Sequence, residues 1–171
     1  MNKLKWSLIA GNIVLLAVIF TWMLLGKEQL LQKGDILVLK LQPADPRSFM
    51  MGDYMTLNYD INDEIPTGNS FEDFRFYRIN EKKRAQVVVK MNDSLAVFVR
   101  LYQAGSPLKK GEFVLSSEKA FFNYRILPNE YLFQEGRSKH FDRAEYAQFR
   151  VNRSGDVVIE CLLDKDRKEL R

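Results

Sequence analysis

Residues 6–25 form an unbroken apolar run, and this run constrains the fold more than any other feature of the chain. It reads WSLIAGNIVLLAVIFTWMLL and contains no charged side chain. A helix of about 20 residues rises about 30 Å, which matches the hydrocarbon thickness of a bilayer. Trp6 and Trp22 lie near its two ends, where indole rings favour the headgroup level. The sequence therefore predicts a transmembrane helix over residues 6–25, in contact with the lipid bilayer.

The charges that flank this run predict its orientation. Lys3 and Lys5 precede the run, and basic flanks are retained on the cytoplasmic side. Lys27 lies on the other side but is followed directly by Glu28, so the bias stays with the N-terminal flank. We expect a cytoplasmic tail at residues 1–5 and the rest of the chain in the periplasm or outside the cell.

A cleaved signal peptide is the alternative interpretation of the same run. The run is longer than the apolar core of about 7–15 residues that signal peptides usually have. The sequence MLLGK at its exit contains no A-x-A-like cleavage site, and no cysteine follows that could carry a lipid. We therefore expect a retained signal-anchor and a single-pass protein of the bacterial cytoplasmic (inner) membrane.

The composition of the remaining chain is that of one ordinary domain with a mixed surface. The whole chain has 26 Lys and Arg against 22 Asp and Glu, and both signs are interspersed beyond the apolar run. This pattern is unlike the basic face of a nucleic-acid-binding protein, so no nucleic acid is expected as a partner. Cys161 is the single cysteine and lies in an apolar run, which favours a buried small side chain.

The segment beyond the helix divides into three regions. A polar juxtamembrane link at residues 26–34 continues the helix, a β-rich domain follows at residues 35–163, and a charged tail at residues 164–171 is expected to fray. Strand-like runs alternate with turn signals throughout the domain, without a repeat or a second domain. The expected fold class is a mainly β, or β-rich α+β, domain with a twisted antiparallel sheet or a partly open barrel.

Individual elements follow from the same pattern. A first strand is expected at residues 35–42, and a second at residues 54–61, where apolar and polar residues alternate. The segments 85–103 and 147–163 each have a central turn and should form antiparallel hairpins. Further expected elements are strands at residues 74–79, 113–115 and 120–126, a short apolar segment at residues 131–134, and a short helix at residues 138–146.

The densest group of special residues lies at residues 45–59, which read DPRSFMMGDYMTLNY. This string resembles the bacterial GDYXXLXY proteins, and all five specified positions match, namely Gly52, Asp53, Tyr54, Leu57 and Tyr59. Asp45 and Arg47 belong to the preceding Asp-Pro-Arg, which the resemblance also covers. Met51 stands where the family often has a basic residue. The resemblance implies a single-pass membrane protein without an assigned activity, often associated with polytopic membrane proteins.

Turn chemistry explains most of the residue types in this motif. Gly52 offers backbone freedom, and Asp53 can accept hydrogen bonds from amides where a turn becomes a strand. Arg47 can form a planar ion pair with a neighbouring carboxylate. Tyr54 and Tyr59 are five positions apart, so they face opposite sides of a regular strand. We interpret the motif as a structural nucleus, with a ligand-binding or catalytic site as the alternative.

A membrane-anchored serine hydrolase is the competing functional class. Signal peptidases combine a serine with a lysine base, and Ser48 and Lys90 would be that pair here. The Ser-Met-x-Pro-Thr string of those enzymes is absent. His140 is the single histidine and is expected at a solvated helix end. One histidine and one cysteine cannot form a structural zinc site, so no metal and no cofactor is expected.

The function expected from these observations is that of a membrane-anchored, extracytoplasmic accessory or binding protein rather than an enzyme. Its partner would be an integral membrane protein, bound through the transmembrane helix, an aromatic sheet face, or both. Ser7, Ala10 and Gly11 are small and would let another helix approach closely. The aromatic clusters at residues 71–77 and 121–124 are expected in the core, with a docking face as the alternative.

Overall fold

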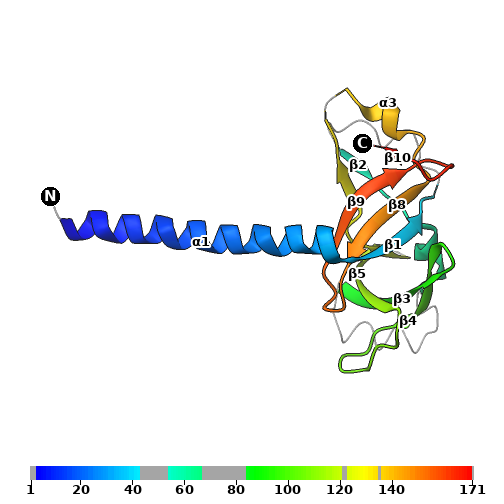
Figure 1. Cartoon of the computed structure of the whole chain (residues 1–171). Coiled ribbons are helices and arrows are strands. Elements are labelled where there is room, and N and C mark those ends of the chain that lie inside the picture. The colour runs from blue at the N-terminus through cyan, green and yellow to red at the C-terminus, as the bar shows by residue number, and fades with distance from the viewer. Residues whose placement is uncertain (1–2, 43–53, 67–83, 121–122, 135, 171) are drawn as a thin grey trace.

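A long N-terminal helix projects from a β-rich domain in the computed structural model of the chain (Figure 1). The structure describes residues 3–42, 54–66, 84–120, 123–134 and 136–170. The helix, α1, extends over Lys3–Lys33. Within the described residues, Leu8–Lys33 is the single helical segment long and apolar enough to cross a membrane. Its apolar side chains are exposed along the projecting part of the helix, as the predicted transmembrane segment requires.

The domain contains three antiparallel sheets among the described residues. The first sheet has the strand order β1 (Asp35–Lys40), β8 (Tyr146–Val151), β9 (Val157–Leu163) and β10 (Glu169–Leu170). The second has the order β4 (Leu95–Leu101), β3 (Arg84–Asn92), β5 (Glu112–Ala120) and β6 (Asn123–Ile126). The third consists of β2 (Tyr54–Thr56) and β7 (Glu130–Leu132). The edge strands β1 and β4 lie close together, so the two larger sheets curl around one core as a partly open barrel.

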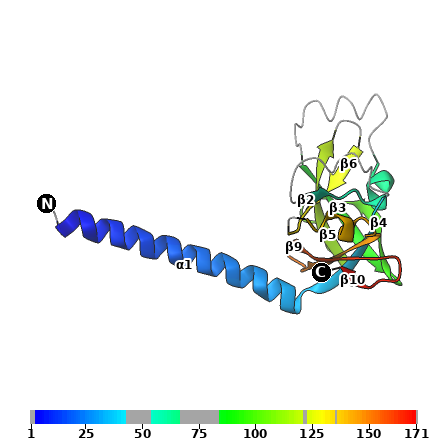
Figure 2. The same cartoon turned by 90° about the horizontal axis from the view of Figure 1, so that it is seen from above.

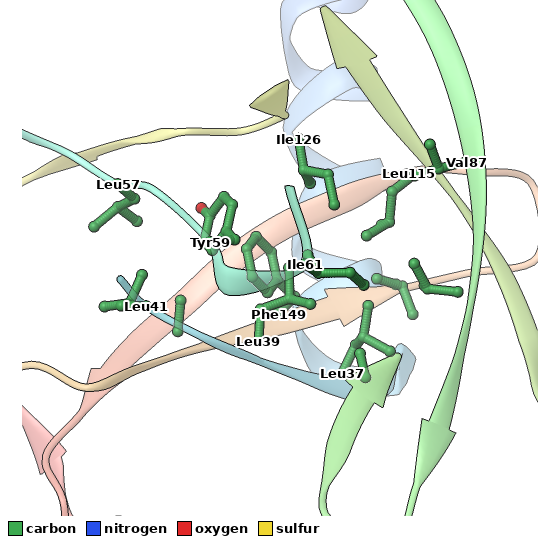
Figure 3. Packing of buried hydrophobic residues seen from close by; sticks show 14 of the residues in the cluster. Leu37, Leu39, Leu41, Leu57, Tyr59, Ile61, Val87, Leu115, Ile126 and Phe149 are labelled. Carbon is green, nitrogen blue, oxygen red and sulfur yellow. The ribbon is translucent and has the colours of Figure 1, made fainter. Parts of the chain in front are cut away.

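The core fills the space between the two larger sheets and is closed by the chain that links them (Figure 3). Leu37, Leu39 and Phe149 enter it from the first sheet, and Val87, Leu115 and Ile126 enter it from the second. Leu57, Tyr59 and Ile61 reach it from the segment after β2. All of these side chains are buried, which is the dominant favourable contribution to folding.

Both predicted hairpins are confirmed. β3 pairs with β4 through a two-residue turn in which Asp93 has a φ of 52°, a left-handed conformation that aspartate tolerates better than most residues. β8 pairs with β9 through residues 152–156, where Gly155 has a φ of 89°. The short turn motifs read from the sequence therefore placed four strands correctly.

The predicted strand at residues 54–61 forms a ladder only in its first part. The alternation itself is confirmed, because Met55, Leu57, Tyr59 and Ile61 are buried while the residues between them are more exposed. After β2 the backbone makes a single bridge from Tyr59 to Leu41 and then forms the 3₁₀ helix η2 over Asp60–Glu64. An alternation of apolar and polar residues shows that one face of an extended segment is buried. It does not require that the backbone of that segment pairs with a neighbouring strand.

Two other predicted elements are corrected by the pairing of distant segments. The predicted helix at residues 138–146 is reduced to α3, Ser138–Phe141, because Tyr146 already pairs with Lys40 and Leu163 in the first sheet. The C-terminal tail does not fray at β10, whose Leu170 is 1% exposed and pairs with Leu162. The predicted strand at residues 74–79 lies outside the described residues.

Candidate functional site

The described part of the predicted motif consists of Tyr54, Leu57 and Tyr59. The other predicted site residues of this region, Asp45, Arg47, Ser48, Gly52 and Asp53, lie outside the described residues. Their turn chemistry and the ion pairing of Arg47 therefore stay predictions. The three described residues nevertheless show how the second half of the motif is used.

Tyr59 and Leu57 form hydrogen bonds with the two residues that precede β7. The Tyr59 hydroxyl donates a hydrogen bond to the carbonyl oxygen of Pro128 at 2.6 Å, and its ring meets Phe149 edge-on with 5.7 Å between centroids. The Leu57 N–H donates to the carbonyl oxygen of Asn129 at 2.7 Å. Burial raises the pKa of the Tyr59 phenol, because its ionised form would lose hydration. These contacts support a structural role for both residues.

Tyr54 lies on the opposite face from Tyr59, as the spacing of the two tyrosines predicts. Tyr54 is 37% exposed, whereas Tyr59 is fully buried. The register places Tyr54 directly opposite Leu132 on β7, so both side chains are on the outward face of the two-stranded sheet. Tyr54 is therefore the exposed tyrosine of the motif, and Tyr59 is the buried one.

A chain of side-chain hydrogen bonds runs beside the motif. Gln42 Nε2 donates to Asp63 Oδ2 at 2.6 Å, and Asn58 Nδ2 donates to Gln42 Oε1. Asn62, which is buried, donates through Nδ2 to Asn58 Oδ1 at 2.8 Å and accepts at Oδ1 from the Ile126 N–H at 3.1 Å. These hydrogen bonds connect η2 to β6 and to the segment after β1.

A second constellation, which we call the joint, connects α1 to the domain through Leu30, Gly34, Arg150 and Glu160. One residue, Gly34, separates the last helical residue from β1. The Gly34 N–H donates to the carbonyl oxygen of Leu30 at 2.8 Å. A Cβ at Gly34 would lie 2.5 Å from that same oxygen and 3.1 Å from the carbonyl oxygen of Val151, so the close approach requires glycine.

The joint is completed by a forked ion pair on β8 and β9. Arg150 donates to Glu160 through Nε at 2.7 Å and Nη2 at 3.1 Å, and through Nη1 to the Gly34 carbonyl oxygen at 3.1 Å. Gln148 Nε2 donates to Glu160 Oε2 at 2.9 Å. The hydrogen bond to Glu160 raises the pKa of the Arg150 guanidinium. Arg150 thus donates a hydrogen bond to the carbonyl oxygen of the single residue between α1 and the domain.

Sequence reasoning missed the joint because its key residue sits at an irregularity. Gln148 pairs with Cys161, and Phe149 pairs with Ile159, which leaves Glu160 as the extra residue of a β-bulge. A bulge re-aims a side chain, and here it accompanies the contact of Glu160 with Arg150. The sequence did contain one signal for the joint, namely the opposite charges of Arg150 and Glu160 on the two strands of the predicted hairpin.

Of the residues considered for catalysis, Ser48 lies outside the described residues, whereas Lys90, His140 and Cys161 are described. Lys90 lies on β3 with an exposed side chain, whereas a lysine base is normally activated by a desolvated pocket. His140 lies on α3, its Nε2 is buried without a hydrogen-bond partner, and its ring meets Phe141 edge-on. His140 is therefore partly buried and not a solvated helix end. Cys161 is 1% exposed, which confirms the prediction of a buried small side chain.

A hollow of about 500 Å³ lies beside β4, but its charged residue is already engaged. Phe98, Val99 and Leu101 line it together with Arg100. Arg100 Nη1 donates to Glu112 Oε1 at 2.9 Å, and this hydrogen bond lowers the pKa of the Glu112 carboxyl. In the part of the chain that the structure describes, no group of three or more His, Cys, Asp or Glu side chains is placed to hold a metal ion.

Comparison with known proteins agrees with the motif and with the layout of the chain. The comparison with curated proteins gave no match, and neither did the comparison with solved structures. The family model described as "GDYXXLXY protein" matches residues 16–162, which is well over half of the chain. The match includes the last part of the apolar helix and nearly the whole β-rich domain. The chain therefore belongs to the GDYXXLXY family.

Proposed function

We propose that the protein is a membrane-anchored accessory protein that assembles with an integral membrane partner in the bacterial cytoplasmic membrane. In this proposal α1 is retained as a single-pass anchor, the N-terminus is cytoplasmic and the β-rich domain is extracytoplasmic. The proposal is supported by the exposed apolar surface of α1 and by Lys3 and Lys5, which precede its apolar run. The observation that carries the proposed partner is the side chain of Asn12.

Asn12 is a polar side chain without a partner in the apolar part of α1. No described group of the chain forms a hydrogen bond with its amide, and Asn12 is exposed. Thr21 behaves differently, because its hydroxyl donates to the carbonyl oxygen of Ala17 at 2.8 Å. Hydrocarbon offers an amide no hydrogen bond. A partner helix that forms a hydrogen bond with the Asn12 amide would stabilise the helix pair by about 0.6–2 kcal/mol.

A comparison of two variants tests the partner. The full chain, extracted in mild detergent and affinity-purified, should co-purify repeatedly with one integral membrane protein. Asn12→Leu should reduce that recovery, whereas Thr21→Val should not, since Thr21 is satisfied within its own helix. If the full chain emerges alone, or both variants behave like the parent, the proposed helix partner is wrong. Recovery of a second copy of the chain instead would make the partner a homodimer and would also overturn the proposal.

The proposed topology has an independent test. Arg153→Cys, in an exposed turn, should react with a membrane-impermeant maleimide in intact spheroplasts, and Asn2→Cys should react only after lysis. N-terminal sequencing of the membrane-extracted protein should return the N-terminal residues of the chain. A mature start near Gly26 would show that the helix is a cleaved signal peptide and would contradict the anchor.

A hydrolase dependent on Ser48 would be revealed by the same purified material. A serine-directed probe should leave the full chain unlabelled. Labelling that disappears in Ser48→Ala would contradict the accessory function and favour the enzymatic class.

A further inference from the structure

The joint determines which side of the domain faces the membrane. Both backbone polar groups of Gly34 are engaged, the N–H with Leu30 and the carbonyl oxygen with Arg150. Leu30 itself is only 6% exposed, so the last turns of α1 are fixed against the domain. If α1 spans the bilayer, as the proposed function requires, the domain cannot swing freely and presents one defined side to the lipid.

The length of α1 beyond the apolar run places that side close to the headgroups. The run ends at Leu25 and the helix continues to Lys33, which corresponds to about 12 Å of rise. The headgroup region adds about 5–8 Å to each side of the hydrocarbon core. Figures 1 and 2 both show β2 on the side of the domain from which α1 emerges. With the bilayer placed across the apolar run of α1, this side of the domain is nearer to the headgroups than the opposite side.

The outward face of β2 and β7 carries an apolar pair at this position. Leu132 is 77% exposed, and among the described residues outside α1 it is the most exposed large hydrophobic side chain. Its exposure is close to that of Trp22 on α1, which is 78%. Tyr54 lies directly across from it, with an apolar ring and a polar hydroxyl. The alternate residues of the sheet, Met55 and Tyr131, turn inward to the core.

We propose that Tyr54 and Leu132 contact the bilayer interface and form a second attachment of the domain to the membrane. Leucine is transferred favourably out of water, and tyrosine prefers the headgroup level, where its ring is apolar and its hydroxyl is wet. The inner face of this two-stranded sheet packs against α3, where the Tyr131 ring meets the Phe141 ring edge-on with 5.5 Å between centroids. The domain is thereby held at two points, the joint and this apolar pair.

Fluorescence quenching by lipid-attached nitroxides tests this contact in the full chain. Leu132→Cys, combined with Cys161→Ala to remove the native thiol, is labelled with an environment-sensitive dye and reconstituted in phosphatidylcholine vesicles. Val99→Cys in the same background is the matched control, because Val99 is 41% exposed on β4, away from the side of α1 in both views. Leu16→Cys reports whether α1 is in the bilayer.

The expected result is loss of most fluorescence at position 132 with headgroup-level quenchers, and little loss at position 99. Equal quenching at positions 132 and 99, with strong quenching at position 16 by deep quenchers, would overturn the contact and leave the anchor intact. Absence of quenching at position 16 would instead contradict the membrane span itself. A label at position 132 that is shielded from aqueous quencher without lipid quenching would indicate a protein–protein contact and would also overturn the proposal.

Discussion

At the scale of single residues, Tyr59 shows which part of a motif can be predicted from sequence. Alternation along residues 54–61 predicts that Met55, Leu57, Tyr59 and Ile61 share a face, and all four are buried. The partner of the Tyr59 hydroxyl could not be predicted, because Pro128 is 69 positions away in the chain. The pattern predicts burial locally, but a buried hydroxyl finds its acceptor only through the tertiary fold.

Tyr59 should make the folded state sensitive to alkali. Its phenol has a raised pKa in the folded domain but ionises near pH 10 in the unfolded chain. This contribution to stability is present below about pH 10 and is lost as the pH rises, by up to about 1.4 kcal/mol per pH unit. Tyr59→Phe should cost about 1 kcal/mol at neutral pH and lose less stability above about pH 10 than the parent does. Urea unfolding of the full chain in mild detergent at neutral and alkaline pH measures both.

The control for this prediction is Tyr54→Phe, whose ring lies on the outward face. This variant should follow the parent at both pH values. An unchanged alkaline loss in Tyr59→Phe would contradict the assignment of the effect to the buried phenol.

At the scale of elements, the sequence predicts hairpins well and their irregularities poorly. Both hairpins and the helix were predicted from local signals, namely turn residues and an apolar run. The bulge at Glu160 and the short α3 depend on pairing across the sheet, which local signals do not encode. The joint was missed for this reason, although Leu30, Arg150 and Glu160 lie in elements that were placed correctly.

Breaking the ion pair of the joint should destabilise the domain. Arg150→Met leaves the Glu160 carboxylate and the Gly34 carbonyl oxygen without their shared partner, at an expected cost of about 1–3 kcal/mol. Glu160→Gln should cost less, because its amide oxygen can still accept from Arg150. In a double-mutant cycle measured by urea unfolding, the double variant should lose less stability than the sum of the losses of the two single variants. Additive effects would show that the pair contributes nothing beyond its separate contacts.

The last strand should be required for stability in spite of its length. Leu170 on β10 is almost fully buried, so Leu170→Ala is expected to cost about 2–5 kcal/mol. Lys165→Ala, in the exposed turn before β10, should change the unfolding free energy by no more than about 0.5 kcal/mol. Thermal unfolding of the full chain distinguishes the two variants. Equal melting temperatures would restore the interpretation of a frayed tail.

At the scale of the whole molecule, the fold class was predictable but the closure of the barrel was not. The run at residues 6–25 and the alternating segments predict an anchor and a β-rich domain. The approach of β1 to β4 brings together the edges of two sheets whose strands are separated by more than 50 positions. Contacts of such sequence separation have no local signature, and only the summed burial of both sheets specifies them.

The boundary of the folded domain should not lie at Leu25, where the apolar run ends. A fragment of residues 26–171 retains Leu30, which is buried against the domain, whereas a fragment of residues 35–171 exposes the site that Leu30 covers. The longer fragment should be more stable by about 1.5–3 kcal/mol. Urea midpoints of the two fragments give the comparison, with Leu31→Ala in the longer fragment as a control at an exposed neighbour. Equal midpoints would mean that α1 contributes nothing to the domain.

The single glycine between helix and sheet has a mechanical consequence. A helix whose apolar length exceeds the bilayer thickness tilts, and it stands more upright in a thicker bilayer. A flexible linker between helix and domain would absorb this change in tilt. The N–H and the carbonyl oxygen of Gly34 are both hydrogen-bonded, so the domain tilts together with the helix. In the proposed topology, the angle of the domain to the membrane therefore follows the bilayer thickness, and a protein that binds α1 would also change that angle.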